Sequence, residues 1–589
     1  MSVDLNEFAS TNRPPSDTEL EQLKTILAPG ESKLAQLEKD IKANQDENER
    51  LWKEKEKLLK ELTPARSAAS LIRRLPTEIM EAIFLHARAP KDQYACFRVC
   101  DAPLILLRVC KLWRNIAMHT QELWSSIDIS IPFTVIPLQA PPSPEDLRKQ
   151  ELFLAEVDKW ITRSANLPLS LRLRKGEHIS GAPSGHLEVL HTVLVKLLTQ
   201  SHRWELLDFE SLSETLRAFQ KTTPLPQLKC IRVTDYGWYN PHGLPDGPRS
   251  LFDYRTPFDS PALQKLIITS NTDSPESFNK LHVHWENLVA LTIAAPYARS
   301  PSHGWGDPIQ SMAVGLLPTL AKCANLRRLC LSLPMASESA NGGPTPITLP
   351  SLEALSLEGC CKEMELFLAL VETPSIRELH YYPGYDLSSH ITSGFTNLLH
   401  KYGDQVEVLA FDLPTLPESE FLSCLRNIPI VKQLSVGPDR FESRFGSPPF
   451  YSFINPNGRF IFTNSHIAAL TPKQGEDCSC PRLEVFRCAV KAAVTPDVVM
   501  CFLKAKIDPG LRQISGGGPF RELSLVHLPF EYPIPPYRPQ VLDDDDDPLK
   551  DVRKAGVLLD LARPNYYNPS GYHGPYIERF TQYESDFRH

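Results

Sequence analysis

Apolar residues recur in one short pattern along most of the chain, from about residue 152 to residue 530. An apolar residue is followed by another three positions later and by a third two positions after that, as in Leu228, Ile231 and Val233. The last two flank a polar residue, and this alternation is typical of a β-strand with one buried face. The pattern recurs at Trp204, Leu207, Phe209; Leu263, Leu266, Ile268; Leu288, Leu291, Ile293; Leu326, Leu329, Leu331; Leu352, Leu355, Leu357; Ile376, Leu379, Tyr381; Val406, Leu409, Phe411; Val431, Leu434, Val436; Leu483, Phe486, Cys488; and Phe520, Leu523, Leu525.

Helical sequence lies between these strand patterns, for example HTVLVKLLTQ at 191–200 and MELFLALVE at 364–372. Recurrence at intervals of 24 to 52 residues indicates a solenoid, in which each repeat stacks one strand and one helix on the next. The pattern resembles the leucine-rich repeat in a degenerate form, since the asparagine that typically follows the strand is mostly missing. We therefore predict an α/β protein, with an N-terminal helix and a helical module followed by an irregular leucine-rich-repeat-like domain over 152–530 with a curved parallel sheet.

One long helical pattern covers residues 18–62. Its central stripe follows alternating steps of three and four, which is a heptad repeat. The stripe consists of Leu34, Leu37, Ile41, Asn44, Asn48, Leu51, Lys55, Leu58 and Leu62. A dimeric coiled coil is one interpretation. A single amphipathic helix, folded back on its own chain or standing partly alone, is favoured because the three polar positions weaken a zipper.

A compact helical module is predicted over 71–129. Pro76 is tolerated in the first turn of a helix, and apolar residues follow it at helical spacing. A second segment opens at Pro103 and leads into the strand-like residues 125–129. Short helices of this length bury little apolar surface among themselves, so apolar residues grouped on one face indicate a site for a partner.

The same module resembles the F-box motif. Leu75-Pro76 opens the first helix, Val109-Cys110 and Trp113 mark the second half, and Leu123-Trp124 closes it. The resemblance implies binding to a Skp-type adaptor and, through it, to a cullin ubiquitin ligase. By that resemblance the adaptor-binding candidates are Leu75, Pro76, Ile79, Ile83, Phe84, Val109, Cys110, Trp113, Leu123 and Trp124.

One departure from the F-box pattern is a longer stretch between its halves, Ala89 to Ala102. We expect this stretch to form a loop that lengthens the module. The alternative is a helical hairpin that only packs on the repeats. A heptad helix running into Leu-Pro also resembles a layout common in mushroom-type fungal F-box proteins.

In a leucine-rich-repeat array, the residues between the buried positions of each strand face the concave side. We expect a target to be recognised by these residues. The candidates for target binding are Arg232, Lys265, Arg328, Glu378, His380, Arg487 and Glu522. Their charges are mixed, so they favour no single class of ligand. A solvated surface is the default interpretation for each of them.

The flanking segments carry turn-forming or polar sequence. We expect a disordered tail over 1–17, a proline-rich linker over 130–150, and an irregular tail over 531–589 with one short helix around 548–562. The formal net charge of -8 gives no general support for nucleic-acid or membrane binding. Cysteines inside apolar runs, such as Cys110, Cys323 and Cys330, indicate reduced, buried thiols. With no apolar leader and no long apolar stretch, we expect a cytoplasmic or nuclear protein.

Motifs that carry chemistry are weak. Cys478-Ser479-Cys480 and Cys360-Cys361 lack the paired spacing of a zinc site, and the glycines after Ser515 lack the ending of a phosphate loop. The acidic run Asp543 to Asp547 lacks calcium-loop spacing. We therefore expect no metal, no cofactor and no catalytic site.

The sequence supports two functions of different classes. The favoured one is a substrate receptor, in which the F-box holds a ligase, the repeats hold an unknown target protein, and other subunits transfer ubiquitin. The alternative is a repeat scaffold that assembles complexes without degradation. An undetected enzyme is a remote third hypothesis.

Overall fold

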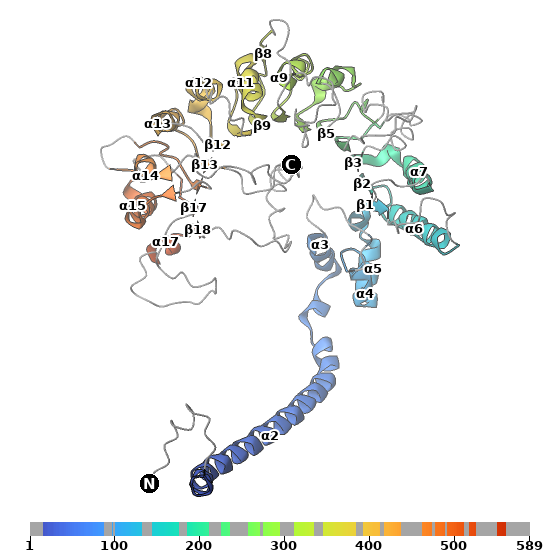
Figure 1. Cartoon of the computed structure of the whole chain (residues 1–589). Helices are drawn as coiled ribbons and strands as arrows, with labels where there is room; N and C mark the ends of the chain where they lie inside the picture. The colour runs from blue at the N-terminus through green and yellow to red at the C-terminus, as the bar shows by residue number, and fades with distance from the viewer. Residues whose placement is uncertain are drawn as a thin grey trace. The chain divides into compact units, whose positions relative to one another are not determined.

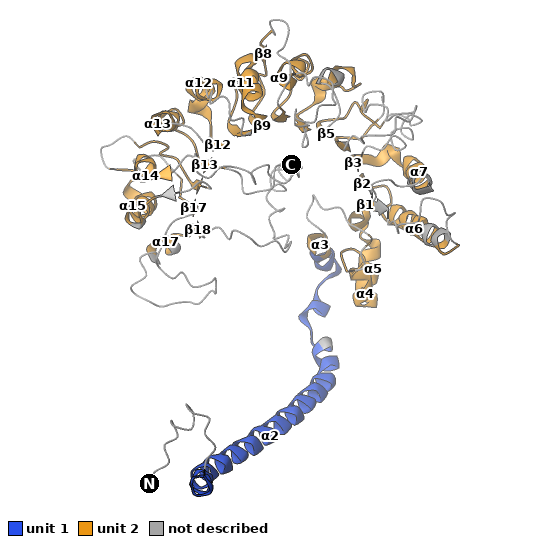
Figure 2. Ribbon diagram, viewed as in Figure 1, with its two compact units in different colours: residues 1–83 blue, residues 84–589 orange. Residues whose placement is uncertain are grey.

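The chain forms two compact units, Met1–Ile83 and Phe84–His589, in a computed structural model (Figure 2). The structure describes residues 16–87, 97, 100–131, 144–175, 185–210, 225–235, 257–270, 275–294, 311–334, 345–384, 393–412, 418–437, 462–473, 478–488, 492–511, 518–525 and 550–560. Most of the predicted tails, 1–17 and 531–589, and most of the predicted linker lie outside the described residues.

The first unit consists mainly of helix α2, Asp17–Ala68. The exposed surface of α2 carries ion pairs between neighbouring turns, such as Lys53 with Glu49 at 2.6 Å, and pairs of this spacing stabilise a helix. The helix continues past the predicted end at residue 62, and its side chains are exposed along almost the whole length. A short 3₁₀ turn, Leu71–Arg74, and helix α3, Thr77–Ala87, follow.

The second unit opens with short helical elements: α4 Leu106–Val109, α5 Lys111–His119 and the 3₁₀ turn η2 Gln121–Trp124. Helix α6, Pro144–Arg163, follows the first strand. It occupies the end of the predicted linker 130–150, whose extent is thus corrected. The reason is that Pro144 stands at the first helical position, where proline's missing N–H costs no hydrogen bond.

A fourteen-stranded parallel sheet forms the centre of the second unit. Each strand pairs in parallel with the next main strand along the chain, as a solenoid requires. The strands are β1 Ser126–Ile131, β2 Leu169–Lys175, β3 Trp204–Glu210, β4 Cys230–Asp235, β5 Lys265–Ser270, β6 Ala290–Ala294, β7 Arg328–Leu333, β9 Ala354–Cys360, β11 Glu378–Gly384, β12 Val408–Phe411, β13 Gln433–Val436, β15 Val485–Cys488, β17 Glu522–Leu525 and β18 Leu558–Asp560.

Helices cover the outer side of this sheet, and the strands line its inner side (Figure 1). They are α7 Gly185–Leu198, α9 Met312–Gly315, α10 Leu317–Leu320, α11 Cys361–Leu370, α12 Ser393–Tyr402, α13 Glu418–Arg426, α14 Asn464–Leu470, α15 Pro496–Ile507 and α17 Lys550–Lys554, with 3₁₀ turns Ser201–Arg203, Pro275–Lys280, Trp285–Asn287 and Gly403–Gln405. Two further sheets have two parallel strands each. One pairs β8 Ile347–Thr348 with β10 Val371–Glu372, and the other pairs β14 Phe462–Thr463 with β16 Ala492–Ala493. The predicted α/β solenoid is confirmed.

The core lies between the sheet and its helices. Every apolar triplet of the sequence pattern falls on a strand or just before it, and these side chains are buried. Contacts between aromatic rings run through the later repeats, from the tilted pair Tyr381 and Phe395 at 4.8 Å between centroids to the edge-to-face pair Phe502 and Phe520 at 5.4 Å. Burial of these repeated rows is what joins one repeat to the next.

Two buried carboxylates on α11 connect this helix to α9 and α12. Glu363 accepts hydrogen bonds from the Ser311 hydroxyl at 2.8 Å and from the Ala313 N–H at 3.1 Å, at the start of α9. Glu365 accepts from the Tyr381 hydroxyl at 2.7 Å and from the Gly394 N–H at the start of α12. Carboxylates at helix N-termini satisfy free backbone N–H groups and complement the helix dipole.

Three strands lie outside the predicted repeat domain or its pattern. β1 begins the sheet, and Trp124, Ile127 and Ile129 repeat the strand spacing, so the end of the predicted F-box module is also the first repeat. β2 has a proline in place of the first apolar residue, although Leu169, Leu171 and Leu173 alternate. β18 corrects the expected helix at 548–562, because only Lys550–Lys554 is helical and the chain then joins the sheet.

Candidate interaction surfaces

The first candidate surface belongs to the first unit and consists of apolar residues around the start of α3. The side chains of Leu75, Ile79 and Ile83 are 37%, 48% and 38% exposed, and Pro76 is exposed as well. Ile79 and Ile83 are one helical turn apart and therefore lie on the same face of α3. Apolar side chains held at such exposure on one helix face are typical of a partner site.

The second candidate surface belongs to the second unit and lies on α4 and α5. Val109 is 55% exposed, Cys110 is exposed, and Trp113 is half-buried. Ile105 and Leu112 are also exposed, at four residues before and three residues after Val109. Sequence reasoning missed these two. Ile105 has helical spacing from Val109, but the extended backbone of Cys110 separates Val109 from Leu112 on α5.

The other predicted adaptor contacts are core residues. Phe84, Leu123 and Trp124 are almost completely buried within the second unit. The ring of Phe84 packs on Trp113 with 4.9 Å between centroids, and Trp124 packs on Trp160 at the same separation. These buried residues support the module and present no surface to a partner, which corrects their assignment as contacts.

Trp124 is held by polar groups as well. Its indole N–H donates to the Ala117 carbonyl at 2.8 Å, and the Arg163 guanidinium lies 4.4 Å from the ring centroid. A buried tryptophan needs such a partner for its N–H. Because Arg163 ends α6, these contacts join the helical module to the first helix of the repeat array.

The third candidate surface is the inner face of the sheet, which carries two rows of side chains. The strand register places Lys265, Arg328, Glu378 and Glu522 in one row, at the start of their strands. It places Arg232, His380 and Arg487 in a second row two residues further along. All seven predicted candidates therefore lie on the inner face. They are half-buried except His380, which is buried.

Charges alternate in the second row over the first four strands. This charge ladder consists of Asp128, Arg172, Asp208 and Arg232, one from each strand. The Asp208 carboxylate lies 2.8 Å from Arg172 Nε and 3.4 Å from Arg232 Nη1, and Arg172 Nη1 lies 4.0 Å from Asp128. Sequence reasoning found only Arg232, because the pairing depends on which strands become neighbours.

Four further candidates pair within the sheet. Arg487 makes a bidentate pair with Glu522 on the next strand, at 2.7 and 2.8 Å. His380 Nε2 lies 2.6 Å from Glu378 on its own strand. These pairs hold the side chains in fixed positions, and two-point arginine contacts of this kind are geometrically specific.

Between its charged ends, the second row consists of neutral residue types, whereas the first row carries Lys265 and Arg328 on the same strands. In the second row the register places Ile267, Thr292, Cys330 and Ser356 on four consecutive strands. They are half-buried or buried, and none is an acidic or basic residue. The second row thus presents a charge ladder at one end, uncharged residue types in the middle and a paired arginine near the other end.

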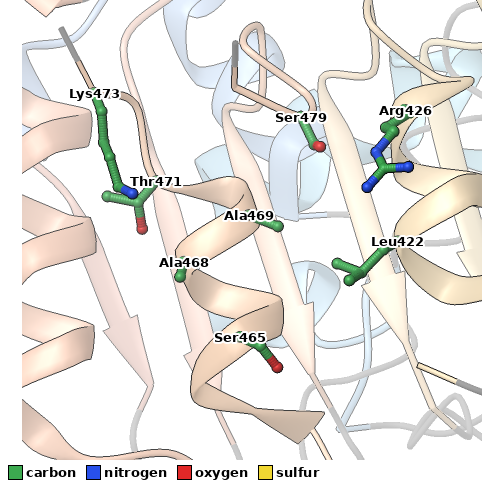
Figure 3. A pocket seen from close by; sticks show the side chains of 8 residues that line it. All are labelled: Leu422, Arg426, Ser465, Ala468, Ala469, Thr471, Lys473 and Ser479. Carbon is green, nitrogen blue, oxygen red and sulfur yellow. The ribbon is translucent and has the colours of Figure 1, made fainter. Parts of the chain in front are cut away.

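A hollow of about 300 Å³ lies on the helical side, between α13 and α14 (Figure 3). Its lining combines small residues with hydroxyls and the cationic residues Arg426 and Lys473. Within this lining, the Ser465 hydroxyl donates a hydrogen bond to the carboxylate of Glu418, at the start of α13.

The three thiols that the sequence predicts to be buried differ in their exposure. Burial raises the pKa of the Cys323 thiol to about 12, so this thiol stays protonated. Cys330 is half-buried, whereas Cys110 is exposed, contrary to its prediction as a buried thiol. Over the described ranges, no three His, Cys, Asp or Glu side chains gather as metal ligands would.

In the part of the chain that the structure describes, no helix has both the length and the apolar character needed to cross a bilayer.

Comparison with known proteins identifies no family. No family model matches the chain, and no curated protein matches it in sequence. Among solved structures, it is similar to a chain of the Rad7 and Elc1 complex in yeast, with 16% identity, 68% of this chain and 92% of that chain covered, and a TM-score of 0.29. It is also similar to an internalin from Listeria monocytogenes, with 10% identity, 74% and 100% covered, and a TM-score of 0.29. For a protein from Bacteroides fragilis the values are 11%, 53%, 74% and 0.28. Likenesses with such low TM-scores carry no argument about function.

Proposed function

We propose that this chain is a protein-binding adaptor of the F-box type, which holds a Skp-type adaptor through its helical module and a target protein through its repeats. The observation that carries the proposal is how the F-box-like residues divide. Leu75, Pro76, Ile79, Ile83 and Val109 are exposed apolar residues, whereas Phe84, Leu123 and Trp124 are buried.

A docking module needs both kinds of apolar residue, the buried and the exposed. Buried aromatic residues such as Trp124 give a small helical module a fixed shape. Exposed apolar residues then supply the area that a partner removes from water, at about 25 cal/mol per Å². A helical hairpin that served only to pack on the repeats would bury its apolar residues, and the exposure of Ile79 and Val109 argues against that alternative.

The inner face of the sheet is the proposed target-binding surface. Its polar side chains stand on parallel strands of one continuous sheet, so their spacing is fixed before a target binds. Such preorganisation lowers the entropic cost of association. Arg232, Arg487 and His380 each pair with a carboxylate of the sheet, and we infer that a target is recognised by its shape and by the order of charges along the strands. Arg232 and Arg487 mark the two charged ends of that surface.

Ubiquitin transfer is assigned to other subunits in this proposal. The chain contributes proximity, because holding a target and a ligase on one molecule raises their effective concentration. We propose no catalytic residue and no cofactor for the chain itself.

The test is a pull-down of the full chain with a purified Skp-type adaptor. The wild type should bind, and the triple variant Leu75→Ala/Pro76→Ala/Ile79→Ala should lose more than about tenfold in affinity, which corresponds to about 1.4 kcal/mol. A matched control is Val195→Ala, since Val195 is exposed to the same 48% as Ile79 but lies on α7. It should bind like the wild type.

Equal binding by the wild type and the triple variant, or no binding by either, would contradict the F-box assignment. In the second case, a target that still binds the repeats would support the non-degradative scaffold. Circular dichroism of the triple variant separates loss of a contact from loss of folding, since its helix content should match the wild type.

A further inference from the structure

The apolar stripe of α2 has no cover within the described residues. The leucines and isoleucine of the stripe are between 43% exposed, at Leu62, and 60% exposed, at Leu34. Trp52 and Leu59, beside the stripe, are exposed as well. A helix whose apolar residues repeat regularly over many turns and remain in water is typical of one strand of a coiled coil.

Proline sets the start of the usable stripe. Pro29 stands inside α2 and is followed by Gly30, which occupies a seam position and adds no side chain to it. Proline lacks the N–H that would bond to the preceding turn. The continuous stripe therefore runs from Leu34 to Leu62.

Heptad positions along this segment follow from the stripe. Leu34, Ile41, Asn48, Lys55 and Leu62 are at position a, and Leu37, Asn44, Leu51 and Leu58 are at position d. A polar residue at a lowers the stability of a coiled coil but specifies its register and number of strands. Asn48 and Lys55 are polar residues of this kind, so the same residues that weaken the seam also favour one arrangement.

Charge complementarity identifies the partner as a second copy in parallel orientation. In a parallel, in-register pair, each g residue faces the e residue five positions later on the other helix. Lys33 then faces Glu38 of the second copy, whereas the residue that would face Glu61, Arg66, lies beyond Pro64, the second proline inside α2. The other g residues of the segment are acidic and face uncharged residues: Asp40 faces Gln45, Glu47 faces Trp52, and Glu54 faces Leu59.

An antiparallel pair would be repulsive. There g faces g, and every g residue of the segment except Lys33 is acidic. When the two helices are centred on Glu47, Asp40 would face Glu54, and Glu47 would face Glu47 of the second copy. A shift by one heptad would again bring acidic g residues opposite each other. Ion pairs within one helix, such as Arg50 with Glu47 at 2.6 Å, soften this repulsion but stay solvent-exposed.

We propose that residues 31–62, between the two prolines inside α2, form a parallel two-stranded coiled coil between two copies of this chain. The dimer carries two repeat domains, so a target with two binding sites would be held by both, and the second contact becomes intramolecular. This inference does not depend on the F-box assignment, because the seam contains no residue of the motif.

The test is sedimentation equilibrium of the full chain at several concentrations. The wild type should have the mass of a dimer, and Leu37→Glu/Leu51→Glu should raise the dissociation constant by more than about a hundredfold. The matched control, Ala35→Glu/Ala43→Glu, adds the same charges on the outer face of the helix and should remain dimeric. A monomeric wild type, a trimer, or equal dissociation of both variants would overturn the proposal.

Orientation is tested by exchanging one charge pair. Lys33→Glu should weaken the dimer by about fivefold, because the new carboxylate would then face Glu38 of the second copy. Lys33→Glu/Glu38→Lys restores opposite charges and should recover the wild-type dissociation constant. Residues 33 and 38 do not lie on adjacent positions of one helix, so recovery reports the contact between copies. A double variant as weak as the single one would rule out the parallel register.

Discussion

Helix α2 and the repeat domain both carry regularly spaced leucines, but these leucines are exposed on α2 and buried in the repeat domain. Leu51 on α2 is half exposed, whereas Leu379 on β11 is fully buried. Each repeat covers the apolar row of its neighbour, so its leucines leave water when the chain folds. The leucines of α2 find no such neighbour within the described residues. Periodicity shows that a surface must be covered, but not which molecule covers it.

The largest expected effect comes from truncating the buried leucine. Leu379→Ala should lower the free energy of unfolding of the second unit by about 2–5 kcal/mol, because it leaves a cavity between sheet and helices. The matched Leu51→Ala, on exposed α2, should change it by less than about 0.5 kcal/mol. Urea unfolding followed by tryptophan fluorescence measures both. A Leu51→Ala effect as large as that of Leu379→Ala would mean that α2 folds as part of the repeat core.

A smaller effect is expected from the buried carboxylate of α11. Glu365→Ala leaves the Tyr381 hydroxyl and the Gly394 N–H without their acceptor, at a cost of about 1–3 kcal/mol. Hydrogen exchange at Gly394 and Phe395 should become faster, since both N–H groups bond to Glu365.

The matched change for Glu365 is Glu372→Ala. Glu372 pairs with Lys401 at 2.7 Å, but both side chains are more than half exposed. Solvent screens such a pair, so the expected loss is about 0–1 kcal/mol. If the two variants lost the same stability, burial of the Glu365 carboxylate would not be what makes it matter.

The smallest expected effect depends on pH. Glu407 accepts a hydrogen bond from Lys432 at 2.6 Å, and this bond lowers the pKa of Glu407 below its ordinary value of 4.5. Because the folded pKa is the lower one, the ionised group adds stability above pH 4.5, and that gain is lost as the pH falls through the folded pKa. The difference in free energy of unfolding between wild type and Glu407→Gln should therefore shrink between neutral pH and pH values below that range.

Glu47 is the matched control for Glu407. A hydrogen bond from Arg50 also lowers the pKa of Glu47, but this carboxyl is fully exposed on α2. Glu47→Gln should leave the pH profile of the second unit unchanged. A constant difference for Glu407→Gln at every pH would show that its charge contributes nothing to folding.

Much of the fold was predictable from the sequence because its signals are local. The spacing of Leu228, Ile231 and Val233 marks a strand wherever it occurs, since alternate strand residues face the same side. Strand β2 escaped because proline replaces its first apolar residue, and β18 escaped because a glycine does. For the helical module, spacing identified the apolar residues but did not separate exposed Ile79 from buried Phe84, which depends on neighbours distant in sequence.

By itself, the sequence determined the strand pattern, the helical stripe of α2 and the class of the fold, because 2.0- and 3.6-residue periodicities come from backbone geometry alone. Only the tertiary structure decided which charges meet. Arg172 and Asp208 are far apart in the chain and lie 2.8 Å apart only because their strands are neighbours. It also decided that Leu123 and Trp124 are buried and that Val109 is exposed. The physical reason is that burial and ion pairing are properties of two surfaces in contact, and a sequence specifies each surface one residue at a time.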